Sequence, residues 1–182
     1  MPFKAGSAAA AIANPLPVSF DLGMKWKGWT AFAGQVMTSL AAAGGNSAMA
    51  FALIDISAEV PLWESALLYL QTRMGAVAPI AGASIEYYLV RRTDVAGESD
   101  DAVPDAGSAL AANFWDQADL IGAFNVTATA NKFYRRTIDL FTFGPLGNTK
   151  WGMGVRNGSS QALSATAGDH INKHNMYARR GA

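Results

Sequence analysis

The feature of this sequence that most constrains its fold is a series of short apolar and aromatic segments, which glycine, asparagine and proline residues separate. From residue 120 onward these segments recur at intervals of roughly ten to fifteen residues, which is typical of an antiparallel β-sandwich. No helical pattern is long enough to cross over between parallel strands. The sequence therefore predicts an all-β fold, an antiparallel β-sandwich. Its later strands are expected over 65–74, 84–92, 120–128, 133–143, 151–157, 161–166 and 171–178.

The first third of the chain gives weaker strand patterns. Residues 18–22 alternate apolar and polar side chains with a period of two, which predicts a strand. The segments 25–32 and 48–56 are also expected to be strands, the first with three aromatic residues. Between them, the alanine-rich stretch 35–42 is compatible with a short helix, and a turn is expected at 44–46.

The strand expected over 84–92 carries apolar side chains on both faces. Ile85, Tyr87 and Leu89 should point to one side, and Glu86, Tyr88 and Val90 to the other. Such a strand belongs inside a two-layer sandwich or against a partner.

The N-terminal residues 1–17 differ from the rest of the chain. They place prolines at positions 2, 15 and 17 among small residues, so neither a regular helix nor a central strand is expected. Alanine and glycine cannot build a local core, and this segment should become ordered only against a partner surface. Phe3 and Leu16 are its bulky anchors. The expected organisation is an extended arm, 1–17, followed by a single β-sandwich domain, 18–182.

The composition excludes several classes of function. Charged residues make up 15% of the chain, below the ~25% that is usual for soluble domains, so part of the surface is expected to be covered by partners. The formal net charge is +0, which provides no long-range field to attract nucleic acid. The chain has no cysteine for disulfides or thiolate chemistry. No stretch approaches the ~20 bulky apolar residues of a transmembrane helix.

Two groups of residues could in principle bind a metal. Five carboxylates lie between Asp94 and Asp105, but the ligand spacing of an EF-hand is missing, so a solvated loop is expected there. His170 and His174 are four residues apart, and on a strand that spacing spans about 13 Å, too far for one metal ion. The sequence therefore predicts no metal, and no cofactor.

Catalytic motifs are also missing from the sequence. No G-x-S-x-G element is present to position a serine nucleophile. The five tryptophans could stack on sugars, but packing in a core or an interface is their commoner use. The basic clusters 91–92 and 132–136 are expected to pair with acidic residues rather than to follow a nucleic-acid strand.

From about Leu67 to Arg180, the chain resembles a family of small structural proteins of tailed phages, of the capsid-decoration or auxiliary head type. The resemblance rests on an ordered set of segments rather than on any one of them. In chain order these are Leu68-Tyr69-Leu70, Ile85-Glu86-Tyr87-Tyr88-Leu89, an acidic loop with Val103-Pro104, Ala128-Thr129-Ala130-Asn131-Lys132-Phe133-Tyr134-Arg135, Gly144-Pro145-Leu146, Lys150-Trp151-Gly152 and residues 157–165.

The resemblance implies a jelly-roll-like β-sandwich on the outside of a capsid, where it bridges neighbouring major capsid proteins. It implies a virion location, no catalytic residues, no membrane and no nucleic acid as partners. By analogy the working unit is a homotrimer on a local threefold axis. The expected interface residues are Phe3, Leu16, Tyr88, Val90 and Trp115.

Three other functions remain open at this stage. A tail, neck or fibre-associated virion protein belongs to the same broad class, and its copy number in the particle would distinguish it. A carbohydrate-binding module would use exposed tryptophans and would bind glycans in isolation. A hydrolase is the enzyme alternative, although no motif places an acid–base pair.

Overall fold

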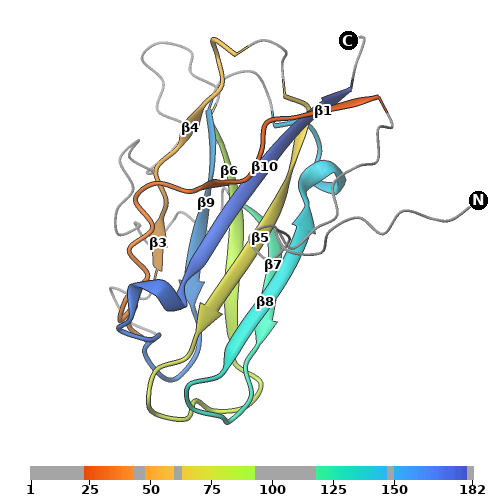
Figure 1. The fold of residues 1–182 in the computed structure, drawn as a ribbon. Helices are drawn as coiled ribbons and strands as arrows, with labels where there is room; N and C mark the ends of the chain where they lie inside the picture. Colours follow the sequence, from red (N-terminus) through yellow and green to blue (C-terminus); the bar gives the residue numbers. More distant parts are fainter. Residues whose placement is uncertain (1–22, 43–47, 60–62, 93–117, 147–149, 180–182) are drawn as a thin grey trace, which may run out of the picture.

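The computed structural model describes residues 23–42, 48–59, 63–92, 118–146 and 150–179. In this part of the chain ten strands form two antiparallel sheets of 5 strands each, which pack face to face as a sandwich (Figure 1). The first sheet contains β1 (Met24–Trp26), β2 (Thr30–Ala31), β5 (Ser65–Arg73), β8 (Phe133–Asp139) and β10 (Ile171–Arg179). The second contains β3 (Ala48–Ala50), β4 (Ile54–Asp55), β6 (Ser84–Arg92), β7 (Asp119–Asn125) and β9 (Lys150–Asn157). Two short 3₁₀ helices, η2 (Leu140–Phe143) and η3 (Ala167–Asp169), follow β8 and precede β10.

The strand pairing is that of a jelly roll. β1 and β2 pair with successive parts of β10, and β3 and β4 with successive parts of β9, so the ten strands fill eight positions. The first position pairs with the eighth, the second with the seventh, the third with the sixth, and the fourth with the fifth. The β5–β10 and β6–β9 pairs join these nested hairpins into two sheets. The predicted all-β, jelly-roll-like sandwich is therefore confirmed.

The core lies between the two sheets. Ile85, Tyr87 and Leu89 of β6 lie on one face, as their alternation predicts; they are at most 1% exposed, and this face points into the core. Trp151 of β9 is fully buried, and its ring meets that of Phe32 edge to face at 5.7 Å. Large apolar side chains from both sheets thus meet in one continuous cluster, and their burial is the main source of stability.

The outer face of the second sheet carries a smaller apolar cluster. Tyr88 and Val90 pack there with Ala50, and Leu53 lies against them. The sheet accommodates Leu53 because Gly152 has no side chain: a Cβ at that position would lie 2.7 Å from a methyl group of Leu53. Both faces of β6 therefore contact apolar groups of the chain itself.

The structure corrects several strand boundaries near the N-terminus. The segment 25–32 is not one strand, because Gly28, with φ +99, turns the chain between β1 and β2. Its amide donates to the side chain of Asn175 on β10. The segment 48–56 is likewise divided into β3 and β4, with 51–53 between them.

The short helix over 35–42 is wrong. Instead the chain crosses the sandwich end in turns, with Ser39 at φ 56 and its amide donating to Ser164 O. The strand over 161–166 is also wrong, because that segment makes only one bridge, from Leu163 to Met74. β8 is shorter than expected because Asp139 caps the 3₁₀ turn that follows, accepting from the amide of Phe141. The expected arm 1–17, the strand 18–22 and the acidic loop 94–105 lie outside the described residues.

His174 is a titratable group inside the core. It lies on β10, is 4% exposed, and packs against the rings of Phe32 and Trp151 at 4.8 and 5.5 Å. Burial lowers its pKa to about 4, and the charge of Lys27 acts in the same direction, whereas Glu59 opposes it. The neutral form is therefore the one that fits the folded core.

This burial predicts that the protein loses stability in mildly acid solution. The unfolded chain protonates His174 near its ordinary value of 6.5, whereas the folded chain does so only near 4. The free energy of unfolding therefore has its full value above pH 6.5, the ordinary pKa of histidine. It falls as the pH drops below this pKa, by roughly 2 kcal/mol between pH 7 and pH 5. Urea unfolding of the wild type and of His174→Phe at both pH values measures this difference. Equal losses in the two proteins would contradict the assignment to His174.

Candidate functional site

The most developed surface feature in the described residues is one end of the sandwich, which we call the loop end. It consists of the segments 74–83, 126–132 and 158–166, which connect the strands at the bottom of Figure 1. Backbone hydrogen bonds join the three segments: Gly75 donates to Ala162 O at 3.1 Å, and Asn131 donates to Gly75 O at 2.9 Å. The loop end is therefore one connected surface built from distant parts of the sequence.

The connection between β5 and β6 is an apolar loop, residues 75–83. It contains only glycine, alanine, valine, proline and isoleucine. Val77 is 60% exposed and Ile80 is 70% exposed, while Pro79 is buried beneath them. A loop at a sandwich end usually carries polar side chains, so an exposed loop without any is unusual and is a candidate contact surface.

The apolar loop is held in place by hydrogen bonds at its ends and its middle. The amide of Ile80 donates to the hydroxyl of Ser160 at 2.8 Å, and that of Gly82 donates to Val126 O at 3.0 Å. Gly75 permits close approach at the other end, since a Cβ there would lie 2.7 Å from Ala162 O. The exposed side chains of Val77 and Ile80 are therefore presented from an anchored backbone.

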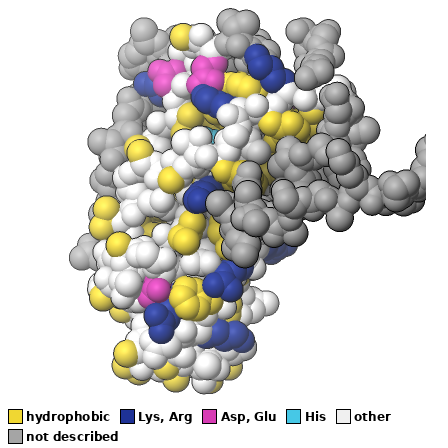
Figure 2. Space-filling model, in the orientation of Figure 1, with side chains coloured by type: hydrophobic (Ala, Val, Ile, Leu, Met, Phe, Trp, Pro, Cys, Tyr) yellow, Lys and Arg dark blue, Asp and Glu magenta, His cyan; other side chains and the backbone are white. Residues whose placement is uncertain are grey.

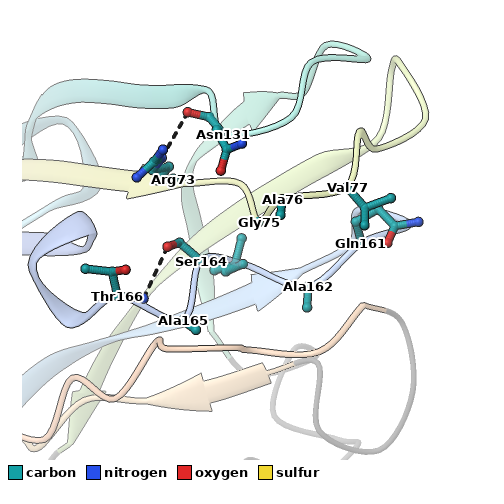
Figure 3. A pocket seen from close by; sticks show the side chains of 11 residues that line it. Arg73, Gly75, Ala76, Val77, Asn131, Gln161, Ala162, Ser164, Ala165 and Thr166 are labelled. Carbon is teal, nitrogen blue, oxygen red and sulfur yellow. Dashed lines mark hydrogen bonds between the residues drawn. The ribbon is translucent and has the colours of Figure 1, made fainter.

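A cavity of about 370 Å³ lies beside the apolar loop, within the range of ligand sites (Figure 3). Its wall on one side is the start of the loop, and on the other the segment 161–166. Arg73 and Asn131 border it, and no aromatic ring is among its lining residues. The lining residues are Arg73, Gly75, Ala76, Val77, Asn131, Gln161, Ala162, Leu163, Ser164, Ala165 and Thr166.

The charge of Arg73 at the cavity border is already paired. Its Nη1 donates to Asp169 Oδ2 at 3.0 Å, and its Nε donates to Asn131 O at 3.0 Å. The guanidinium also lies 5.1 Å from the ring centroid of Phe133. This side chain fixes the strand end to the neighbouring segments, and it does not present a free cation to the cavity.

Ser164, Asp169 and His170 lie together behind the cavity, but not as a catalytic triad. The hydroxyl of Ser164 donates to Asp169 Oδ2 at 2.6 Å, which is the main cause of the lowered pKa of that carboxyl. The imidazole of His170 contacts the hydroxyl of Thr72 and the carbonyl of Ser164, each at 2.9 Å, and burial lowers its pKa. Since the serine hydroxyl donates to the carboxylate and both ring nitrogens contact other groups, the imidazole does not contact the hydroxyl as it does in a catalytic triad.

Asn157, at the end of β9, links the loop end to the segment that contains Leu40 and Ala41. Its Nδ2 lies within 3.0 Å of the carbonyl oxygens of Leu40, Ala41 and Gln161. Its Oδ1 accepts from both the amide and the hydroxyl of Ser159, at 3.1 and 2.6 Å. The side chain is fully buried, so these bonds replace water at a site that water does not reach.

Two cations, one at the end of the β7–β8 connection and one near the start of β8, have no carboxylate partner in the described residues. Lys132 Nζ donates to Thr127 Oγ1 at 3.1 Å and lies over the ring of Tyr134. Arg135 Nε donates to the side-chain oxygen of Gln71 at 2.6 Å and lies over the ring of Phe133. The pairing predicted for the basic clusters is found at Arg91, which pairs with Asp119 and is far from the loop end along the strand.

Of the interface residues predicted from the sequence, Tyr88 and Val90 lie within the described residues, on β6 and not at the loop end. Tyr88 and Val90 are 8% and 3% exposed in the chain and leave little area for a partner. Phe3, Leu16 and Trp115 lie outside the described residues, so their role stays a prediction.

The other sequence candidates are placed as follows. Of the described tryptophans, Trp63 and Trp151 are core residues, at 6% and 0% exposed, as the packing interpretation predicts. His170 and His174 each have separate surroundings, and no group of three or more metal-ligating side chains occurs in the part of the chain that the structure describes. Within the same residues no helix has the length and apolar character to cross a bilayer.

Sequence reasoning missed the loop end because it treated the glycine-rich stretch after β5 only as a separator between strands. The available signal was its composition: from Gly75 to Ala83 no side chain is polar. The anchoring bonds and the cavity could not be inferred, because they depend on segments far away in the sequence, such as Ser160 for Ile80.

Comparison with known proteins adds no assignment. The sequence matches no model of a known protein family, and a search of curated proteins finds no match. The functional argument therefore depends on the geometry of this chain.

The role of Asn157 leads to a stability prediction. Replacing Asn157 with alanine removes the five bonds of a buried side chain and leaves Ala41 O without its donor and the buried Ser159 amide without its acceptor, so the free energy of unfolding should fall by about 3 kcal/mol. Asn125→Ala is the control, because Asn125 is exposed at the end of β7 and should change stability by less than about 0.5 kcal/mol. Urea denaturation measures both values. A loss as small in Asn157→Ala as in the control would contradict this role.

Proposed function

We propose that this chain is a non-enzymatic structural protein of a tailed-phage particle, which binds the outside of the capsid and stabilises contacts between major capsid proteins. The observation that carries the proposal is the apolar loop, anchored on a jelly-roll frame and exposed to solvent at Val77 and Ile80. Such a surface suits protein binding. Jelly rolls recur in viral capsid proteins, and this adds support by analogy, since a fold alone does not give a function.

The polar groups near the cavity support binding over catalysis. Arg73, Asp169, Ser164 and His170 are engaged with one another or with backbone oxygens. These bonds hold the loops in place, and the imidazole and the serine hydroxyl do not contact each other as a base and its nucleophile would. A role based on contact surfaces is therefore favoured over hydrolysis.

A carbohydrate-binding module is less well supported. Sugar sites commonly use an aromatic ring as a platform, and the cavity has no aromatic lining residue. Trp63 and Trp151 are buried in the core. A tail, neck or fibre position in the particle remains the alternative within the same class.

Localisation in the particle tests the proposed function. Imaging of purified virions of the encoding phage should place the protein over the capsid, in a copy number that follows the number of coat subunits. Multiple weak contacts to the lattice would then give tight attachment through multivalency. Density at the tail or neck, with copies limited to one ring, would contradict the capsid location and favour the alternative.

The proposed working unit is a homotrimer on the local threefold axes of the shell. Light scattering of the purified protein should give three times the 19.1 kDa mass of one chain. Since Tyr88 and Val90 are covered, Tyr88→Ala should leave this mass unchanged. A monomer in solution that also sits singly on the capsid, away from any threefold axis, would contradict the trimer.

A further inference from the structure

We propose that the loop end is the surface that docks onto the shell, and that Val77 and Ile80 enter an apolar recess of the coat protein bordered by carboxylates. The inference rests on the proposed function and adds to it the attachment surface and the chemistry of its partner. It commits to one orientation: the β5–β6 loop faces the shell, and the end at which β7 begins faces away.

The apolar part of the contact is defined by the two bulky side chains. Ile80 at 70% exposed and Val77 at 60% exposed are among the most exposed large apolar residues described. Between and around them lie alanines and the buried Pro79, so the partner meets a low surface with two projecting groups. The bond from the Ile80 amide to Ser160 already fixes the bound backbone, and little conformational entropy is lost on docking.

The cavity adds shape to this surface. Val77 forms part of its wall, so the projecting loop and the hollow lie side by side (Figure 3). Asn131, at its border, holds a left-handed conformation at φ 57 and is fixed through its amide to Gly75 O. The projecting apolar loop and the neighbouring cavity give this surface a convex part and a concave part. A partner with shape complementarity to both is expected to be another protein.

The charged part of the contact comes from Lys132 and Arg135. Neither has a carboxylate partner among the described residues, and Arg135 lies against the exposed ring of Phe133. Figure 2 shows lysine and arginine side chains next to apolar ones toward this end of the molecule. A complementary partner therefore carries carboxylates around its recess.

A second copy of this chain fits the surface poorly. In a symmetric contact through the loop end, Lys132 and Arg135 of the two copies would lie near each other, and like charges oppose such a contact. The trimer contact and the shell contact are therefore different surfaces.

A lipid membrane also fits poorly. Apart from Val77 and Ile80, the loop offers alanine, glycine and proline, which bury little apolar area in a bilayer. A flat lipid surface would also leave the cavity beside the loop unfilled. These observations favour a protein partner.

The test uses the full chain and shells of the encoding phage assembled without it. Binding of the wild type is compared with that of Ile80→Asp, which places a charge where the recess is apolar and where its border is acidic. We expect binding to weaken roughly tenfold to hundredfold. Leu120→Asp is the matched control, since Leu120 is 51% exposed but lies at the start of β7, at the end that faces away, and it should bind like the wild type. Melting temperatures check that all three proteins are folded.

Charge reversal supplies a second, independent readout. Lys132→Glu and Arg135→Glu should each weaken binding to the shells, and the wild type should bind less tightly as salt is raised. Both side chains are exposed, so these variants should keep the wild-type melting temperature.

The outcomes separate the inference from the function on which it rests. If the wild type binds and Ile80→Asp binds equally well, the capsid function stands and the docking surface is overturned. If the wild type does not bind the shells, the proposed function fails, and the inference fails with it. Binding of the wild type to vesicles of phosphatidylcholine and phosphatidylglycerol, lost in Ile80→Asp and without binding to shells, would assign the loop to a membrane instead. Loss in Ile80→Asp with retention in Leu120→Asp supports the proposal.

Discussion

The rest of the structure depends on the last described strand, β10, which lies in the first sheet between β5 on one side and β1 and β2 on the other. β10 pairs with β1 and β2 on one side and with β5 on the other, so the first sheet has no continuous order without it. Its polar side chains also set the neighbouring path: Asn172 bonds to Gln35, and Asn175 accepts from the amide of Gly28. The last described strand thus pairs with the first two, β1 and β2, and this pairing is the defining constraint of a jelly roll.

The two sheets, paired in this way, hold the apolar loop in a defined conformation at the loop end. The polar groups that would otherwise need water are buried and bonded beneath the loop end: Asn157 holds three carbonyls, and Asp169 holds both Arg73 and Ser164. Each of these groups lies near a strand end, so the loops begin from fixed points. Because the loops are fixed by buried polar bonds, the exposed face at Val77 and Ile80 is free to be apolar.

The sequence predicted the long central strands well and the short ones poorly. Ser84–Arg92 was bounded correctly and its side chains were divided correctly between two faces, because alternation over nine residues is a strong signal. The segments 35–42 and 161–166 were assigned wrongly because long-range bonds, such as Ser39 to Ser164, override their local preferences. Of the candidate site, only the apolar composition of 75–83 was visible in the sequence. The cavity and its anchors depend on which distant segments the topology brings together.

Although the formal net charge is zero, the distribution of charged residues can still favour one orientation of the molecule on a charged partner. Of the exposed carboxylates described, Asp119 begins β7, Asp139 ends β8, and Asp55 pairs across from the first residue of β9, which places all three away from the loop end. Lys132 at the loop end and Arg135, just beyond it on β8, have no acidic partner among the described residues. Away from the loop end, Arg91 pairs with Asp119 and Lys27 with Glu59. In the proposed complex, a partner with an acidic border would therefore meet cations without carboxylate partners beside the apolar loop, so charge favours the orientation in which that loop supplies the contact.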